Sequence, residues 1–166
     1  MMTDPLVLDI LKRMRTRHLL LMRRSMKTLR HVVRTADPAA LKTKRDGPEG
    51  WTPIVILGHL RDFNAIFYKR ARQIVEEDRP VLTPYNHLQM VIDHKYAEQD
   101  PLAVIEDMAA ERERMAAFYE SLSLEQLLRV AIHPEDGERP LYDFMMQVGH
   151  HDNDHLEQLT RVLAQA

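Results

Sequence analysis

Apolar residues recur three and four positions apart along four long segments of the chain, and polar or charged residues fill the positions between them. This spacing places the apolar side chains on one face of a helix, so each segment predicts an amphipathic α-helix. The predicted helices cover residues 5–33, 53–77, 101–122 and 140–163. Nothing in the pattern predicts a sheet, and the chain is therefore expected to be all-α.

Three of the predicted helices begin with a capping residue followed directly by proline, which suits the first helical position. The pairs are Thr3 or Asp4 with Pro5, Thr52 with Pro53, and Asp100 with Pro101. Proline and glycine mark loops at 37–50, 79–100 and 133–137, and the second of these has room for a short helix. A four-helix bundle buries all four apolar faces and is the fold that we expect.

The composition fits one globular domain over residues 1–166, because a hydrophobic share of 45% is enough for one sizeable core. The chain has no cysteine, which excludes disulfides, thiolate metal sites and a catalytic thiol. No stretch approaches the ~20 apolar residues that span a bilayer, and the first residues do not form a signal peptide pattern. We therefore expect a cytoplasmic protein without a membrane partner.

Charge is distributed unevenly along the chain. Residues 1–45 hold twelve Lys or Arg against three Asp, a net charge of +9, which leaves −11 for the remainder. Such a basic segment can contact nucleic acid or an acidic membrane. However, the segment contains no Phe, Tyr or Trp on which bases would stack, so a solvated helix face that complements the acidic remainder is the better interpretation.

Three of the nine histidines lie on predicted inward faces. His151 and His155 are four residues apart on the last predicted helix, so both imidazoles project from one face and can share one ion. His59 stands between Ile56 and Phe63, where the stripe of the second predicted helix requires an apolar side chain. Three neutral imidazoles in a core need polar partners, and one divalent metal satisfies a nitrogen on each of them.

A three-histidine set leaves coordination positions open for water or substrate, which is typical of a catalytic metal site. Imidazole binds zinc, nickel, iron and copper, so the pattern does not identify the metal. The second nitrogen of each histidine needs an acceptor, and Asp62, Asp152 and Gln158 are the candidates. The alternative is that the histidines are packed and hydrogen-bonded to carbonyl or tyrosine groups, without a metal.

Two more polar residues lie on predicted inward faces. Arg112, between Met108 and Met115, is a candidate for binding an anionic group of a thiol cofactor or substrate, or for pairing with a carboxylate. His18 is a candidate acid or base in a pocket, or a packed and hydrogen-bonded histidine. The sequence has no Gly-rich phosphate loop, nucleophile elbow or convincing serine triad, so it assigns no catalytic residue.

The segments that carry the histidines resemble the DinB-like superfamily, which includes the YfiT type of metal-dependent hydrolase. The resemblance rests on Trp51-Thr52-Pro53 with Gly58-His59-Leu60-Arg61-Asp62, on His133-Pro134 and Gly137, and on the closing run from His151 to Leu159. It implies an up-down-down-up bundle in which His59, His151 and His155 hold a divalent metal, for which we favour zinc or nickel. The family often has Glu where this chain has Asn64, so a candidate base or supporting group is missing here.

The resemblance also implies a range of functions. Characterised relatives include thiol-dependent S-transferases that use bacillithiol or mycothiol, and we take such a transferase, acting on a small-molecule thiol and an electrophilic substrate, as the first hypothesis. A metal-dependent hydrolase of the YfiT type and a non-catalytic metal-binding module of the stress response are the alternatives. A homodimer is plausible from the family and from the long amphipathic helices, and nucleic acid is not an expected partner.

Overall fold

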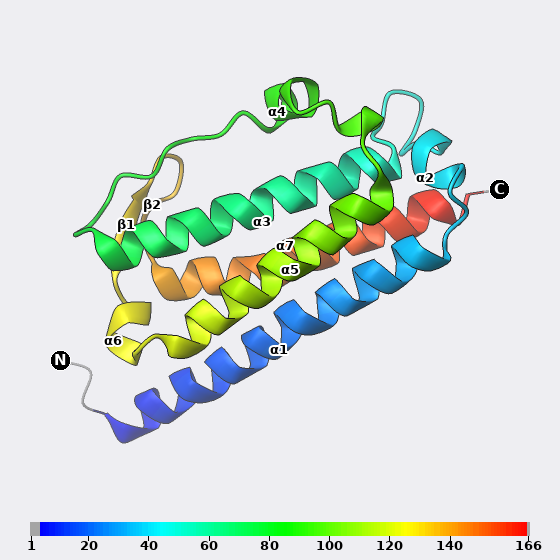
Figure 1. The fold of residues 1–166 in the computed structure, drawn as a ribbon. Helices are drawn as coiled ribbons and strands as arrows, with labels where there is room; N and C mark the ends of the chain where they lie inside the picture. The colour runs from blue at the N-terminus through cyan, green and yellow to red at the C-terminus, as the bar shows by residue number, and fades with distance from the viewer. Residues whose placement is uncertain (1–3, 166) are drawn as a thin grey trace.

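The computed structural model describes residues 4–165, and its core is a bundle of four long helices. They are α1 (Pro5–Thr35), α3 (Pro53–Glu76), α5 (Pro101–Ser121) and α7 (Leu141–Leu163). Along the bundle, α1 and α7 run in one direction and α3 and α5 in the other, which is the up-down-down-up topology implied by the resemblance (Figure 1). The shorter elements are α2 (Ala40–Thr43), α4 (His87–Asp93), the 3₁₀ helix η1 (Tyr96–Glu98), α6 (Leu124–Leu127), β1 (Val130–His133) and β2 (Gly137–Pro140).

The helix starts confirm the sequence prediction at two of three positions. Asp4 Oδ1 accepts a hydrogen bond from Leu6 N at 2.8 Å, and Asp100 Oδ1 accepts one from Ala103 N at 2.8 Å. Thr3, the other candidate for the first cap, lies outside the described residues. Thr52 precedes α3 in an extended conformation, but its side chain does not cap the helix and its buried Oγ1 has no hydrogen-bond partner.

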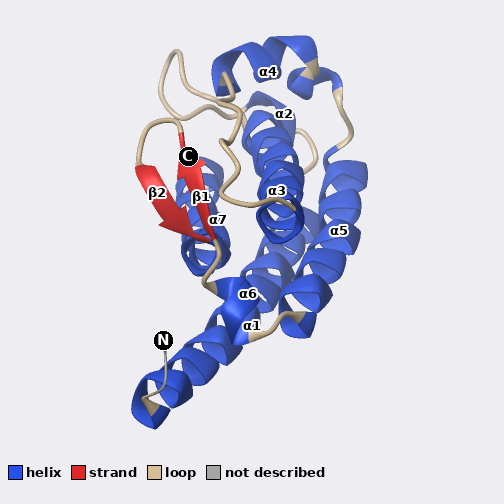
Figure 2. Cartoon of the chain, turned by 90° about the vertical axis from the view of Figure 1, so that its left-hand side faces the viewer, coloured by secondary structure: helices blue, strands red, loops and turns tan. Residues whose placement is uncertain are grey.

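Each long helix packs against two neighbours. Helix α1 contacts α5 and α7, and α3 contacts the same two helices, as the end-on view in Figure 2 shows. The connection over residues 77–100 returns along the outside of the bundle, so α5 begins at the end where α3 began (Figure 1). Since α3 and α7 are adjacent and antiparallel, the first half of α3 faces the second half of α7.

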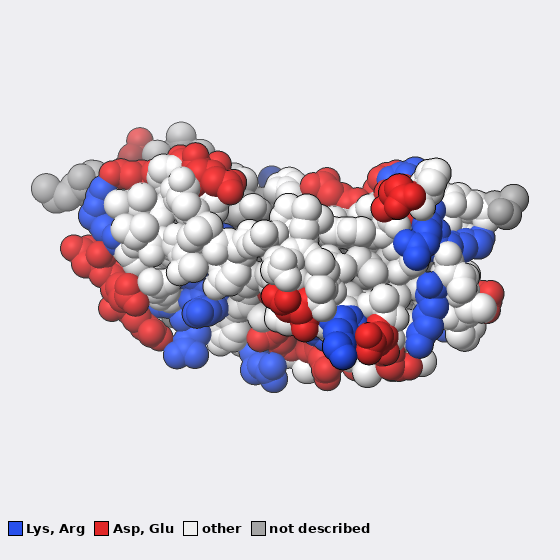
Figure 3. All heavy atoms as spheres, turned by 90° about the horizontal axis from the view of Figure 1, so that it is seen from above, with Lys and Arg blue, Asp and Glu red and all other residues white. Residues whose placement is uncertain are grey.

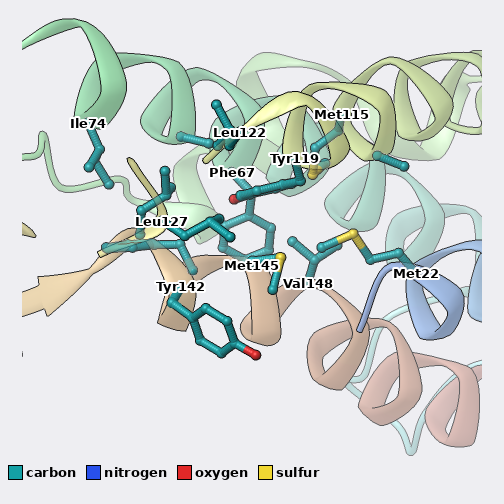
Figure 4. Close-up of a cluster of buried hydrophobic side chains, with 14 of the residues drawn as sticks. Met22, Phe67, Ile74, Met115, Tyr119, Leu122, Leu127, Tyr142, Met145 and Val148 are labelled. Atoms are coloured by element: carbon teal, nitrogen blue, oxygen red, sulfur yellow. The ribbon is translucent and has the colours of Figure 1, made fainter. Parts of the chain in front are cut away.

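The core consists of two hydrophobic clusters placed one after the other along the bundle. One lies near α6 and the hairpin and includes Phe67, Tyr119 and Met145 (Figure 4), and the other includes Leu29, Leu57 and Ile105. Between them, each long helix contributes one buried polar residue. These four residues, which we call the polar layer, are Ser25, Asn64, Arg112 and Asp152.

The fold is mostly helical, as expected, but the prediction that the chain contains no sheet is wrong. Strands β1 and β2 form an antiparallel hairpin in which Val130 pairs with Pro140 and His133 with Gly137. Gly137 adopts φ +73°, a left-handed conformation that glycine takes without strain. Each strand has only four residues, which is too short for a period of two to stand out from a turn.

The first two turns of α1 extend beyond the other helices (Figures 1 and 2). Val7 and Ile10 belong to the apolar stripe of this helix, yet each is 39% exposed. Amphipathic spacing identifies which face of a helix is apolar, but only the partner helix decides how much of that face is covered.

Cations of α1 pair with carboxylates of α5. Arg30 and Arg34 both bind Glu106, at 2.8 Å in each case, and Arg23 binds Glu120 at 2.6 Å. Figure 3, which looks onto the face crossed by the connection 77–100, shows both signs of charge mixed along the rim and a largely uncharged middle. Within residues 4–165, no helix combines the length and apolarity of a membrane span.

Gly58 lets the connection approach α3 closely. A Cβ atom at Gly58 would lie 2.5–2.9 Å from Cγ, Cδ1 and Cβ of Tyr96, which is buried. We expect Gly58→Ala to introduce about 1–3 kcal/mol of strain, offset in part by a gain of up to ~1 kcal/mol in helix propensity.

Urea denaturation measures this loss. Gly149→Ala is the matched control, because the added methyl there would meet the flexible end of the Leu21 side chain, beginning at Cδ2 2.7 Å away. An equal effect of the two substitutions would contradict the role assigned to the Tyr96 contact.

Candidate metal centre

Three histidines from two helices converge beside the polar layer. His59 comes from α3, and His151 and His155 come from α7; one nitrogen of each ring can be chosen so that all three lie within 4.8 Å of one another. The ring centroids are 4.6–5.1 Å apart. The structure therefore brings together the three histidines that the sequence pattern selected, and His59 is buried while the other two are half-buried.

The separation of the ring nitrogens suits a metal ion. Nε2 of His59 lies 3.1 Å from Nε2 of His151. Two imidazole nitrogens bound to one tetrahedral zinc ion at 2.0–2.1 Å are about 3.3 Å apart. The donor set is also chemically suitable, since neutral imidazole is a ligand for zinc and nickel.

The environment keeps two of these imidazoles neutral. Burial and, to a smaller extent, the neighbouring histidines together lower the pKa of His59 to about 3, against the opposing effect of Asp62. Burial, together with His155 and the Arg112 guanidinium, lowers the pKa of His151 to about 3. Because a histidine must be deprotonated at the ligating nitrogen, both residues are ready to bind a metal at neutral pH.

Gln158 orients His155. Its Oε1 lies 2.8 Å from His155 Nδ1, so that nitrogen carries the proton and Nε2 keeps its lone pair. The Gln158 amide in turn donates from Nε2 to Asp46 Oδ2 at 2.9 Å, and Asp46 pairs with Arg161. Of the three candidate supporting residues, Gln158 is therefore the one that contacts a histidine of the cluster.

Asp62 and Asp152 have other partners, which corrects the sequence interpretation. Asp62 accepts hydrogen bonds from Tyr96 and His94, on the connection 77–100, and from Arg61. Burial acts to raise the pKa of Asp62, but these hydrogen bonds outweigh it and hold the pKa below its usual range. Asp152, adjacent in sequence to His151, points instead into the polar layer, where it binds Arg112 and Ser25.

Three other polar residues form no hydrogen bond with the histidine cluster: Arg112, Asn64 and His18. Arg112 is 1% exposed and donates to Asp152 and, at 2.6 Å, to Asn64 Oδ1, so it is a carboxylate partner and not a free cation in a pocket. Asn64 thus belongs to the polar layer. His18 faces His150 across the α1–α7 contact, with ring centroids 6.0 Å apart, and its buried Nδ1 has no partner.

The sequence analysis missed the aromatic surroundings of the cluster. The rings of Phe63 and Trp51 lie 4.4 Å and 5.1 Å from that of His59, and the ring of His87, at the start of α4, lies 6.2 Å away. Phe63 was identifiable, since it stands four residues after His59 on the same face. His87 lies in the connection, and nothing in its local pattern places it beside α3.

A pocket of 290 Å³ lies between α3, the connection 77–100 and the hairpin. The three histidines do not line it, but Phe63, whose ring is 4.4 Å from that of His59, lines its near end with His87. Arg70, Tyr85 and His133 line the other end. The buried Arg70 was also missed by the sequence analysis. Its position in the sequence could have indicated it, because Arg70 follows Phe67 by three positions on the inward side of α3.

The fold and the site define a four-helix bundle in which histidines from two antiparallel helices form a candidate metal centre. The chain belongs to the DinB superfamily, whose family model matches residues 21–159. Comparison with curated proteins gave no match.

Two kinds of solved structure share the fold. YfiT from Bacillus subtilis, a probable metal-dependent hydrolase with an unusual four-helix bundle topology, is 22% identical with a TM-score of 0.78, and the match covers 92% of this chain and 89% of that one. The mycothiol-dependent maleylpyruvate isomerase is 13% identical with a TM-score of 0.71, covering 92% of this chain. The match spans only 61% of the isomerase chain.

Proposed function

We propose that the protein is a metal-dependent enzyme whose ion is held by His59, His151 and His155. The observation that carries this proposal is the convergence of three ligand nitrogens within 4.8 Å, beside a pocket lined by aromatic side chains. Three protein ligands leave at least one coordination position for a substrate. The similarity to YfiT supports the metal, since that protein is a probable metal-dependent hydrolase.

The residues of the chain prepare this position in three ways. Burial keeps His59 and His151 neutral, Gln158 fixes the ring of His155, and the rings of Trp51 and Phe63 pack against His59. A divalent ion bound there would act as a Lewis acid that lowers the pKa of a thiol or a water molecule. His87, exposed beside the cluster, is the side chain that we would test first for moving the proton.

For the reaction, we propose transfer of a low-molecular-weight thiol to an electrophile. The support comes from the mycothiol-dependent isomerase, which shares the fold and by its name depends on a thiol. Hydrolysis is the second candidate, supported in the same way by YfiT. A homodimer remains a prediction.

Elemental analysis of protein purified without a chelating tag tests the metal site. We expect about one zinc or nickel per chain, and loss of that metal in His155→Ala. His150→Ala is the matched control, because His150 is exposed and lies on another face of α7. Trp51, the only tryptophan of the chain, provides a second readout, since Ni²⁺ bound next to it is expected to quench its fluorescence.

The two possible reactions have different products. Metal-loaded protein is incubated with a chromogenic electrophile and either bacillithiol, mycothiol or no thiol. A thioether product that requires both thiol and metal supports the transferase, whereas metal-dependent cleavage of an ester substrate without thiol supports the hydrolase. Metal-free wild-type protein that takes up neither zinc nor nickel would contradict both proposals and favour a non-catalytic module.

A further inference from the structure

Two arginines are buried within residues 4–165, and only one of them forms an ion pair. Arg112 is 1% exposed and forms an ion pair with Asp152. Arg70 is 7% exposed, and none of the ion pairs within residues 4–165 includes it. Because a buried charge without a counterion is unfavourable, Arg70 requires an explanation that Arg112 does not.

The hydrogen-bond and ring contacts of Arg70 are with uncharged groups, although the charge of the nearby Glu135 also acts on it. Nη2 donates to the carbonyl oxygen of Thr83 at 2.8 Å, and Nη1 lies 3.4 Å from Nε2 of His133. The guanidinium lies over the ring of Tyr85, 5.3 Å from its centroid, while the buried Nε has no partner. Burial lowers the pKa of Arg70, but a guanidinium remains protonated at neutral pH. The hydrogen-bonding capacity of this cation is therefore incompletely used.

Arg139, the nearby arginine of the hairpin, has carboxylate partners. Arg139 binds Asp136 at 2.8 Å and Asp143 at 2.6 Å, and its guanidinium covers the ring of Phe144. Its charge is offset by two carboxylates. Arg70, in contrast, forms no ion pair within residues 4–165, although Glu135 and Asp136 also line the pocket; Asp136 pairs with Arg139 and His133.

Arg70 lies at the far end of this pocket, and Phe63, whose ring is 4.4 Å from that of His59, lies at the near end. The pocket has a volume of 290 Å³, which accommodates an end group or a short chain and not a drug-sized molecule. His59 and Arg70 are eleven residues apart on α3, or about 16 Å along the helix axis. Phe63 and Phe67 line the pocket between them.

We propose that Arg70 binds a carboxylate group of an elongated substrate whose reactive end lies at the three histidines. This inference rests on the proposed function, because it assigns the substrate class of the same site. The planar guanidinium matches a carboxylate, which can accept two parallel hydrogen bonds from it. The apolar walls between the two ends suit an uncharged linking chain.

Glu135 is the competing partner within the protein. It is exposed, lies on the turn between β1 and β2, and lines the same pocket as Arg70. If Glu135 serves as the counterion of Arg70, Glu135→Gln should destabilise the protein and leave carboxylate affinity unchanged. If the pocket is a carboxylate site, the same substitution removes a like charge and should tighten carboxylate binding.

Succinate is the probe for the site, and NMR of ¹⁵N,¹³C-labelled metal-free and zinc-loaded protein is the measurement. We expect saturable shifts of the Arg70 Nε–Hε signal and of the Tyr85 and His133 ring signals. Arg70→Gln should weaken succinate binding about tenfold or more, since hydrogen bonds to charged groups are the stronger ones. Arg72→Gln is the matched control, because Arg72 lies on the same helix, is exposed and pairs with Glu76.

Two comparison ligands show whether the site recognises a carboxylate. Succinamide, which is neutral, should not bind, and inorganic phosphate should bind more weakly than succinate. Tighter binding of phosphate would overturn the assignment to carboxylate. Unchanged succinate affinity in Arg70→Gln, or wild-type shifts confined to residues outside the pocket, would overturn the site itself, and the second outcome does not depend on the folding of any variant.

Failure of this proposal is distinguishable from failure of the proposed function. Arg70→Gln leaves the three histidines intact and should retain the metal content of the wild-type protein. Succinate binding that requires Arg70, in protein that takes up no metal, would support the carboxylate site and contradict the metalloenzyme. Normal metal binding without succinate binding would support the metal site and contradict the carboxylate site.

Discussion

Replacing Arg112 with alanine is expected to destabilise the metal-free bundle by about 3–5 kcal/mol. Arg112 and Asp152 are each 1% exposed, and Arg112 Nη2 lies 2.9 Å from Asp152 Oδ1. Removing the guanidinium leaves the Asp152 carboxylate buried with only Ser25, at 2.5 Å, as a side-chain partner. An uncompensated buried charge is costly because the protein interior cannot replace the water that it loses.

A double variant shows whether the pair itself or only its disruption matters. Since the desolvation of two charges can exceed their attraction, Arg112→Met combined with Asp152→Leu is expected to be far less destabilising than Arg112→Ala alone, and near-neutral or stabilising if the side chains pack well. Urea denaturation followed by circular dichroism gives both values. A loss below about 1 kcal/mol for Arg112→Ala would show that the pair is not buried as the structure indicates.

The polar layer has a consequence beyond stability. Each of its four residues comes from a different long helix, and Asn64 and Asp152 bind the same guanidinium. A slip of one helix along its neighbours would separate these partners. We therefore expect the double variant to show broader NMR signals near His151 even where its stability is near that of the wild-type protein, because the layer specifies the register of the helices.

The stability of the metal-free protein is expected to fall as the pH drops from about 6.5 toward 3. An unfolded histidine has a pKa of about 6.5, whereas burial lowers the pKa of His59 and of His151 to about 3 in the folded protein. In this window the unfolded chain binds more protons than the folded one, so acid favours unfolding. The stabilising difference is complete above pH 6.5 and is lost as the pH falls toward the folded value.

The expected slope is at most about 1.4 kcal/mol per pH unit for each of the two histidines. Unfolding free energies are measured between pH 5 and 7.5, above the range in which carboxyl groups ordinarily titrate; Arg161 lowers the pKa of Asp46, which moves it further from this window. His18 and His133, whose pKa values burial also lowers, add to the slope. The variant His59→Gln/His151→Gln should lose most of the slope. A metal-free wild-type protein with constant stability from pH 6.5 to 5 would contradict the burial of these neutral imidazoles.

The sequence determined the four long helices and the histidine set. Apolar spacing is a local property of the chain, and the Asp4 and Asp100 caps depend only on residues two or three positions away. His151 and His155 share a face because of helix geometry alone. His59 was identified because a polar residue interrupted an apolar stripe, and the tertiary structure places it beside the other two.

Only the tertiary structure decided which polar residues meet. Asp152 was predicted to support a histidine, but its direction on α7 places it against Arg112 and Ser25, 40 and 127 residues away in sequence. The short hairpin depends on its pairing with the connection, where Leu82 N donates to Ile132 O at 2.9 Å. Arg70 and His87 line one pocket because the connection packs against α3. Periodicity fixes the direction of a side chain within its own helix, whereas the partner it finds depends on how separate elements pack.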